Sequence, residues 1–69
     1  RDIRKKLQSL ERKMNTAQRK VDEAKQAQLE VDPYDYVALG EAQIKVKECE
    51  DRLAALEEEW LEHAAMLEG

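Results

Sequence analysis

The sequence predicts an all-α fold in which two long helices form an intramolecular antiparallel coiled-coil hairpin. Three observations predict it: a mirror-symmetric spacing of apolar residues, a single proline near the middle, and a composition typical of coiled coils. Apolar residues recur at steps of four and three in the first half, and the second half repeats those steps in reverse order. These steps place the residues on one stripe of each helix, the seam of a coiled coil. The pairs expected to face each other across the seam are Leu10–Trp60, Met14–Leu56, Ala17–Leu53 and Val21–Cys49.

The composition disfavours a wide globular core. The chain has 69 residues, of which 41% are charged, 42% are hydrophobic and 4% are aromatic. So short and polar a chain cannot bury a thick interior, which argues against a compact enzyme. A disordered chain of similar charge content would lack a sustained apolar stripe. We therefore expect residues 1–69 to form a single helical hairpin.

The first helix is predicted over about residues 2–31. This stretch contains no Gly and no Pro and is rich in good helix formers, so nothing interrupts a helix of about 45 Å. Two small seam residues, Ala17 and Ala24, alternate with larger ones. They are expected to face Leu53 and Val46, which lets the helices interdigitate without voids.

A turn is predicted over about residues 32–35. Pro33 ends the first helix because it lacks an amide hydrogen and biases Asp32 away from helical geometry. The second helix, about residues 36–68, is expected to have either Asp32 or Asp35 as its N-cap. The heptad phase also shifts across this segment. A single continuous helix would need both a stutter in its heptad repeat and a kink at the proline. A hairpin explains both features.

Several large apolar side chains lie outside the seam near the turn. They are Leu29, Tyr34, Tyr36 and Ile44. We expect them either to form a small cluster that closes the tip or to act as a docking surface. Gly40 lies one turn inside the second helix, where it costs about 1 kcal/mol relative to Ala, so close backbone packing is expected near the tip.

Charge divides the two halves of the chain. Residues 1–30 contain nine Lys or Arg against five Asp or Glu, a net charge of +4, whereas residues 31–69 contain three against eleven, a net charge of −8. Basic dipeptides recur one heptad apart in the first helix, about 10.5 Å along the axis. With Leu7, Met14 and Val21 at heptad position a, the first cation of each dipeptide occupies the outward f position and the second occupies the flanking g position. Pairing across the seam cannot neutralise the cations at f. The candidate nucleic-acid-binding residues are Lys5, Lys6, Arg12, Lys13, Arg19 and Lys20.

Two other interpretations of this basic stripe are a protein-binding surface and a passive solvated face. A basic helix beside an acidic one also helps to hold a hairpin together. The expected register supports that role only in part. Lys13 would approach Glu59 favourably, but the like-charged Lys20 and Arg52 would approach each other. Phosphate binding is therefore the leading interpretation.

The residue patterns required for catalysis are missing from this sequence. Two Gly residues cannot supply a P-loop or a dinucleotide fingerprint, and no Ser-His-Asp set is present. Glu59 and His63 alone are too few for a zinc site. Cys49 and Trp60 lie on the seam, where a small buried thiol and a large apolar ring have packing roles. We expect no catalytic residue, metal site or cofactor site in this fragment.

The chain is expected to be cytoplasmic and to be a piece of a longer protein. No segment approaches the roughly 18 apolar residues of a membrane span, and the basic start does not resemble a signal peptide. The first residue is Arg rather than Met, as expected for an excised piece.

Two motifs carry a resemblance to a known family. They are the segment Asp32-Pro33-Tyr34-Asp35-Tyr36-Val37-Ala38-Leu39 and the later segment Leu56-Glu57-Glu58-Glu59-Trp60-Leu61-Glu62. Together they resemble the C-terminal domain of ABC-F type ATPases, the Uup-like group. The resemblance covers nearly the whole chain, although Glu59 stands where the family often has Arg. It implies a hairpin coiled coil that follows two ATP-binding cassettes and binds nucleic acid.

The resemblance and the charge pattern lead to one expected function. The chain would be a binding domain for DNA, ribosomal RNA or tRNA that is not catalytic by itself, and the cassettes of a parent ATPase would bind ATP and Mg. Nucleic acid is the expected partner, with the ribosome or a protein as further candidates and no membrane contact. The hairpin is expected to be a monomer. The alternative is a protein–protein interaction or spacer coiled coil that uses the turn tyrosines and Ile44.

Overall fold

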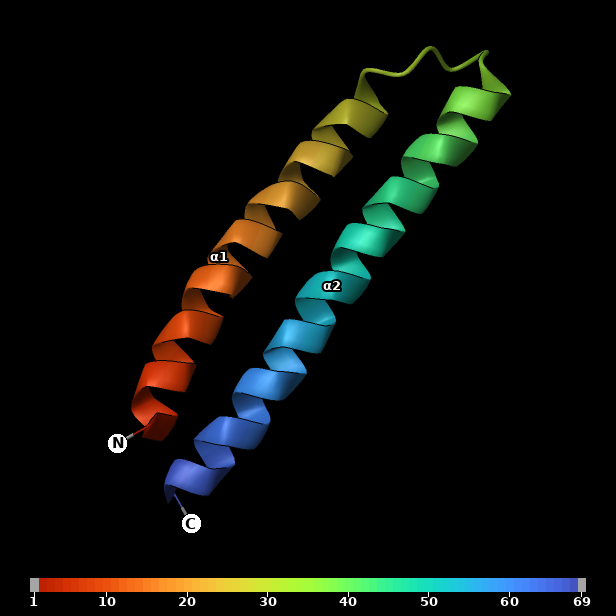
Figure 1. Cartoon of the computed structure of the whole chain (residues 1–69). Helices are drawn as coiled ribbons and strands as arrows, with labels where there is room; N and C mark the ends of the chain where they lie inside the picture. The colour runs from red at the N-terminus through yellow and green to blue at the C-terminus, as the bar shows by residue number, and fades with distance from the viewer. Residues whose placement is uncertain (1, 69) are drawn as a thin grey trace.

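The structure, a computed structural model, describes residues 2–68, with Glu68 described by its backbone alone. Helix α1 spans Asp2–Leu29, and helix α2 spans Tyr36–Glu68. The helices run antiparallel, side by side, and the turn joins them at one end (Figure 1). The extents along the principal axes are 53 × 15 × 12 Å, and no strand occurs among the described residues. The prediction of an all-helical chain with two long helices is confirmed.

Helix α1 ends at Leu29, two residues before the predicted end at residue 31. Beyond it, the backbone forms hydrogen bonds to the third preceding residue: Glu30 N donates to Ala27 O at 3.1 Å, and Val31 N donates to Gln28 O at 3.4 Å. These tighter bonds commonly close the last turn of an α-helix. The helix thus stops before the residue that the proline restricts.

Asp35 is the N-cap of α2. Its Oδ1 accepts a hydrogen bond from Ala38 N at 3.0 Å, and its carbonyl accepts one from Leu39 N at 3.0 Å. Asp32 stabilises the turn instead, because its Oδ1 accepts from Tyr34 N at 2.9 Å and its carbonyl accepts from Asp35 N at 3.0 Å. Of the two caps that the sequence allows, Asp35 has this role, which typically contributes about 1 kcal/mol to stability.

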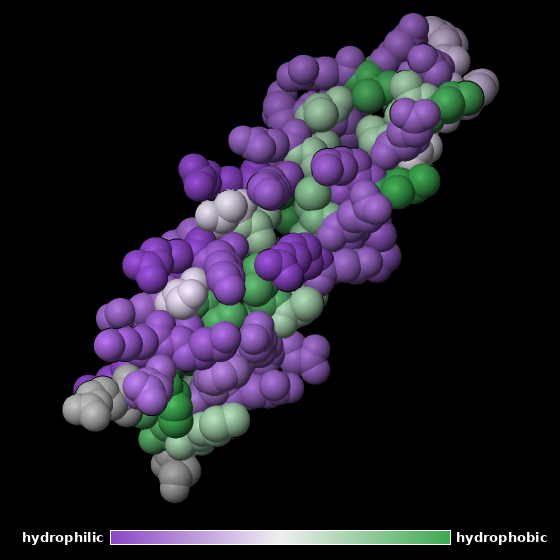
Figure 2. All heavy atoms as spheres, viewed as in Figure 1, coloured by the Kyte–Doolittle hydropathy of each residue, from purple (hydrophilic) through white to green (hydrophobic). Residues whose placement is uncertain are grey.

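The core is a seam between the two helices. Its central cluster contains Leu10, Ala17 and Leu56, and three half-buried side chains pack against it: Met14, Leu53 and Trp60. Hydrophobic side chains, in green, run between the hydrophilic flanks in Figure 2. The buried side chains among the described residues all lie at predicted seam positions. They are Leu7, Leu10, Ala17, Val21, Ala24 and Leu56.

The turn end of the molecule is not closed by apolar packing. Five large side chains there, which we call the apolar tip, are Leu29, Tyr34, Tyr36, Val37 and Ile44. They are between 61% and 84% exposed, so the closed cluster, one of the two alternatives, is wrong, and the docking surface stays a prediction. The expected close packing at Gly40 is also wrong, because a Cβ placed there would have no neighbour within 4 Å.

Replacing Leu10 should cost much of the hairpin's stability. Leu10 is only 1% exposed, and Leu→Ala at a buried site removes about 2–5 kcal/mol from the free energy of unfolding. We expect Leu10→Ala to lie near the lower end of that range, because a two-helix seam relaxes easily around a cavity. Leu61→Ala is the control, since Leu61 is 62% exposed and should change stability by less than about 0.5 kcal/mol. Urea unfolding followed by far-ultraviolet circular dichroism measures both; similar losses for the two variants would contradict the described seam.

Candidate nucleic-acid interface

A groove of about 350 Å³ opens along one flank of the seam. We call it the basic groove, and its lining consists of Ser9, Arg12, Lys13, Thr16, Ala17 and Lys20 of α1 with Arg52 and Leu56 of α2. The buried Ala17 and Leu56 form its floor, whereas its charged residues are exposed. Ala17 contributes only a methyl group to the seam, which leaves space between Lys13 and Lys20. A small core residue therefore shapes the groove.

Four cations and no carboxylate line the basic groove. Lys13 and Lys20 lie one heptad apart on α1, and Arg52 lies across from them on α2. Ser9 and Thr16 add hydroxyl groups on the α1 side. Ammonium and guanidinium groups are hydrogen-bond donors without acceptors, so the groove is complementary to an anion. Phosphate suits it well, because guanidinium binds phosphate oxygens in a bidentate manner.

The ion pairs that form among the described residues lie away from the basic groove. Lys25 Nζ on α1 lies 3.7 Å from Glu50 Oε2 on α2, at e positions of the heptad rather than g positions. Within α2, Lys47 Nζ lies 2.8 Å from Asp51 Oδ1. The hydrogen bond to the Asp51 carboxylate, together with its charge, raises the pKa of the exposed Lys47 above its ordinary value. Within this part of the chain, the groove cations thus have no carboxylate in an ion pair with them.

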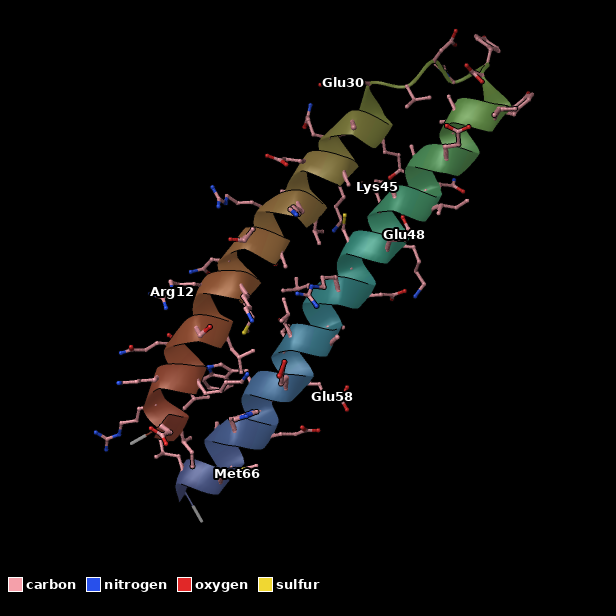
Figure 3. All side chains as sticks on the ribbon, in the orientation of Figure 1. Arg12, Glu30, Lys45, Glu48, Glu58 and Met66 are labelled. Carbon is pink, nitrogen blue, oxygen red and sulfur yellow. The ribbon has the colours of Figure 1, made fainter. Side chains whose placement is uncertain are left out.

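A smaller hollow of about 180 Å³ continues the basic groove toward the turn. It shares Ala17, Lys20 and Arg52 with the groove and adds Lys45, Glu48 and Cys49. Lys45 extends the row of cations, whereas Glu48 introduces a carboxylate; both are labelled on α2 in Figure 3. Cys49 is half-buried, not fully buried as predicted, because it borders this hollow.

Three of the six predicted nucleic-acid-binding residues come together in the basic groove. These are Arg12, Lys13 and Lys20. Arg12 lies at the outer rim and points away from α2 in Figure 3, as expected for an f position. The other three are exposed on α1 but do not line the groove: Lys5, Lys6 and Arg19. The predicted stripe is therefore divided between the groove and the outer face of α1.

Arg52 and Lys45 belong to this surface, although the sequence reasoning did not select them. Their heptad position could have identified them. With Val46, Leu53 and Trp60 at position a of α2, both occupy g positions, and in an antiparallel pair the g positions of the two helices face each other. The expected approach of Lys20 to Arg52 is consistent with the structure, in which both line the same groove. Such a like-charged pair is unfavourable by itself, but it becomes favourable when an anion lies between its members.

Polar contacts also mark the end of the seam away from the turn. Trp60 Nε1 donates a hydrogen bond to Glu11 Oε2 at 3.2 Å, a contact between the helices that the sequence reasoning missed. The Trp60 ring packs against the core cluster, as predicted. His63 Nδ1 lies 2.8 Å from Glu59 O, so this ring nitrogen carries the hydrogen. The expected approach of Lys13 to Glu59 produces no ion pair in the described part of the chain.

Neither a metal centre nor a membrane-spanning helix is found within residues 2–68. No group of three or more His, Cys, Asp or Glu side chains is placed to hold a metal ion there. Neither described helix has an apolar stretch of the length that crossing a bilayer requires.

Comparison of the chain with protein-family models, with curated proteins and with solved structures found no match. Any functional proposal therefore rests on the sequence and on the geometry and charge of the hairpin itself.

Reversing the charge of Arg52 should stabilise the free hairpin. Arg52→Glu removes the repulsion with Lys20 and allows attraction instead, which we expect to raise the free energy of unfolding by about 0.3–1 kcal/mol at low salt. The gain should shrink as salt screens the charges. Arg52→Gln is the matched control, because it removes the repulsion without adding attraction and should give a smaller gain. Urea unfolding at low and high salt tests this, and a loss of stability in Arg52→Glu at low salt would contradict it.

Proposed function

We propose that this chain is a nucleic-acid-binding helical hairpin that contacts backbone phosphates along α1 and in the basic groove. The observation that carries the proposal is the convergence of Arg12, Lys13, Lys20 and Arg52 in one groove without a carboxylate in its lining. The contacting residues would be Lys5, Lys6, Arg12, Lys13, Arg19 and Lys20, with Arg52 added from α2.

The spacing of these cations suits a phosphate backbone. Lys13 and Lys20 lie about 10.5 Å apart along the helix axis, so the two side chains can reach different phosphates of one nucleic acid. Each cation that replaces a condensed counterion adds a favourable entropy of ion release. Contacts of this kind position nucleic acid without reading its sequence, so DNA and RNA both fit the surface.

Binding would be one-sided, because the end of α2 away from the turn is acidic. Glu57, Glu58 and Glu62 are exposed there, and Figure 3 shows Glu58 on the side of α2 that faces away from α1. These carboxylates repel phosphate. A nucleic acid would therefore lie along α1 and the basic groove and avoid the back of α2.

We infer that the two helices pair within one chain in solution, as an antiparallel coiled coil. The central seam cluster and the bond between Trp60 and Glu11 support this arrangement. Folding of a monomeric hairpin is unimolecular, so its thermal unfolding midpoint should not change over a roughly hundredfold range of protein concentration. A midpoint that rises with concentration would instead indicate a dimer.

The resemblance to ABC-F type ATPases suggests where such a hairpin would act. The chain would be the C-terminal domain of a cytoplasmic parent enzyme whose cassettes bind ATP and Mg and hydrolyse the ATP. The domain itself would be non-catalytic and would deliver the parent to DNA, ribosomal RNA or tRNA. The residues that support this assignment are the Asp35-Tyr36 pair at the start of α2 and Trp60-Leu61-Glu62 within the helix.

The second candidate function is a protein-interaction or spacer module. The observation that favours it is the apolar tip, whose five side chains are exposed at the turn. A passive spacer has no need of such a surface, because exposed apolar patches promote association. The two functions use different parts of the hairpin and are compatible with each other.

Charge reversal in the basic groove should weaken nucleic-acid binding more than the same change elsewhere on α1. The groove variant is Lys13→Glu, Lys20→Glu and Arg52→Glu, and the matched control is Lys5→Glu, Lys6→Glu and Arg19→Glu. Titrations of the labelled chain with short duplex DNA and with short RNA, followed by NMR chemical shifts, locate the contacts. Affinity measured against salt counts them, because each phosphate contact contributes about 0.7 to 0.9 to the slope of log affinity against log salt.

We expect the groove variant to lower the salt slope by about two to three units. The control should lower it less, because Lys5, Lys6 and Arg19 lie outside the groove, where contact with a bound strand is less direct. Equal losses in the two variants would show that only net charge matters and would remove the role of the groove. Unchanged affinity in the groove variant would contradict nucleic-acid binding by this surface.

A further inference from the structure

The side chains of the apolar tip are largely exposed. Its side chains range from 61% exposed for Ile44 to 84% for Tyr34. Green hydrophobic spheres reach the surface at the turn end of the molecule in Figure 2. Clustered exposure of this kind typically marks an interaction site.

Gly40 provides an independent observation at the same place. It lies three residues after Val37 and four before Ile44, so all three share one face of α2. A Cβ at Gly40 would meet nothing within 4 Å, and no glycine in the described residues has a positive φ. Neither packing against the described residues nor backbone geometry therefore requires glycine here, although glycine weakens a helix. A partner that approaches the backbone closely between Val37 and Ile44 would account for it.

The charge of the tip defines the chemistry of that partner. Residues 26–44 contain no Lys or Arg but contain four exposed carboxylates: Glu30, Asp32, Asp35 and Glu41. These carboxylates repel phosphate, and the row of cations that lines the basic groove and the smaller hollow ends at Lys45, next to Ile44. An apolar centre with an acidic border is complementary to an apolar surface with a basic border.

The tip is also held in a defined shape before binding. Asp32 Oδ1 accepts from Tyr34 N and Asp35 Oδ1 accepts from Ala38 N, which orders the turn on both sides of Tyr36. A surface that is already ordered loses less conformational entropy when a partner binds.

We infer that the apolar tip, with Gly40 at its centre, docks an amphipathic helix of a protein partner that carries large apolar side chains bordered by Lys or Arg. This inference builds on the second candidate function and is independent of the basic groove. The small residue between two larger ones lets a crossing helix pack closely across the ridge of Val37 and Ile44.

A synthetic amphipathic peptide with Leu at seam positions and Lys elsewhere serves as the probe, and the same peptide with Glu in place of Lys is its control. In an NMR titration of the full 69-residue chain, the Lys peptide should cause chemical-shift changes centred on Val37, Gly40 and Ile44, and the Glu peptide should cause none there. Ile44→Ser should weaken binding at least tenfold, whereas Leu61→Ser, also on an exposed face of α2, should leave it unchanged. No binding, equal binding of the Glu peptide, or shifts confined to the acidic segment 57–62 would overturn the inference.

Gly40→Ala separates docking from stability. It should raise the unfolding midpoint of the free hairpin, because alanine favours the helix and the added methyl meets no neighbour, yet it should weaken peptide binding several-fold. Unchanged peptide affinity in this variant would overturn the role of Gly40. The groove variant Lys13→Glu, Lys20→Glu and Arg52→Glu should still bind the peptide at the tip, and Ile44→Ser should still bind nucleic acid. These two results distinguish a failure of the tip from a failure of the groove.

Discussion

Among the described residues, each helix packs only against the other, and the whole fold depends on this constraint. Isolated helices gain little stability from propensity alone, so α1 and α2 depend on burying one shared stripe. Only seam positions are buried among the described residues, and even Met14 and Trp60 remain half-buried. Every other face is available to solvent or to partners. A small set of seam contacts thus holds together a long molecule whose remaining surface is exposed.

Side-chain size within the seam shapes that surface. At the centre of the seam, Ala17 is buried together with Leu10 and Leu56, yet it is too small to fill the flank beside it. The basic groove opens where that volume is missing, and Lys20 and Arg52 stand on its two sides. Ala17 therefore belongs both to the packing of the seam and to the lining of the groove. A larger side chain at position 17 would change both the seam and the groove.

The sequence predicted the features of the fold that hydrophobic periodicity and backbone chemistry control. It did not predict the contacts of side chains outside the seam. The two helices, the seam and the break at Pro33 follow from spacing and from a missing amide hydrogen. The sequence left open whether the tip is a closed cluster or an exposed surface, because heptad position places Ile44 outside the seam but does not say whether anything folds over it. Arg52 was missed because a like-charged approach was treated as a weakness of pairing. The bond from Trp60 to Glu11 was missed because it joins an a position to an e position.

The hydrogen bond of Trp60 gives the hairpin an intrinsic optical reporter. The chain has a single tryptophan, and its indole N–H meets the carboxylate of Glu11 on the opposite helix at 3.2 Å. Indole emission depends on local polarity and on nearby charge, so the fluorescence of this one ring follows the separation of the helix ends. Circular dichroism follows helix content instead. Tryptophan fluorescence can thus follow separation of the two helices, and circular dichroism can follow loss of helix, as separate events in the unlabelled protein.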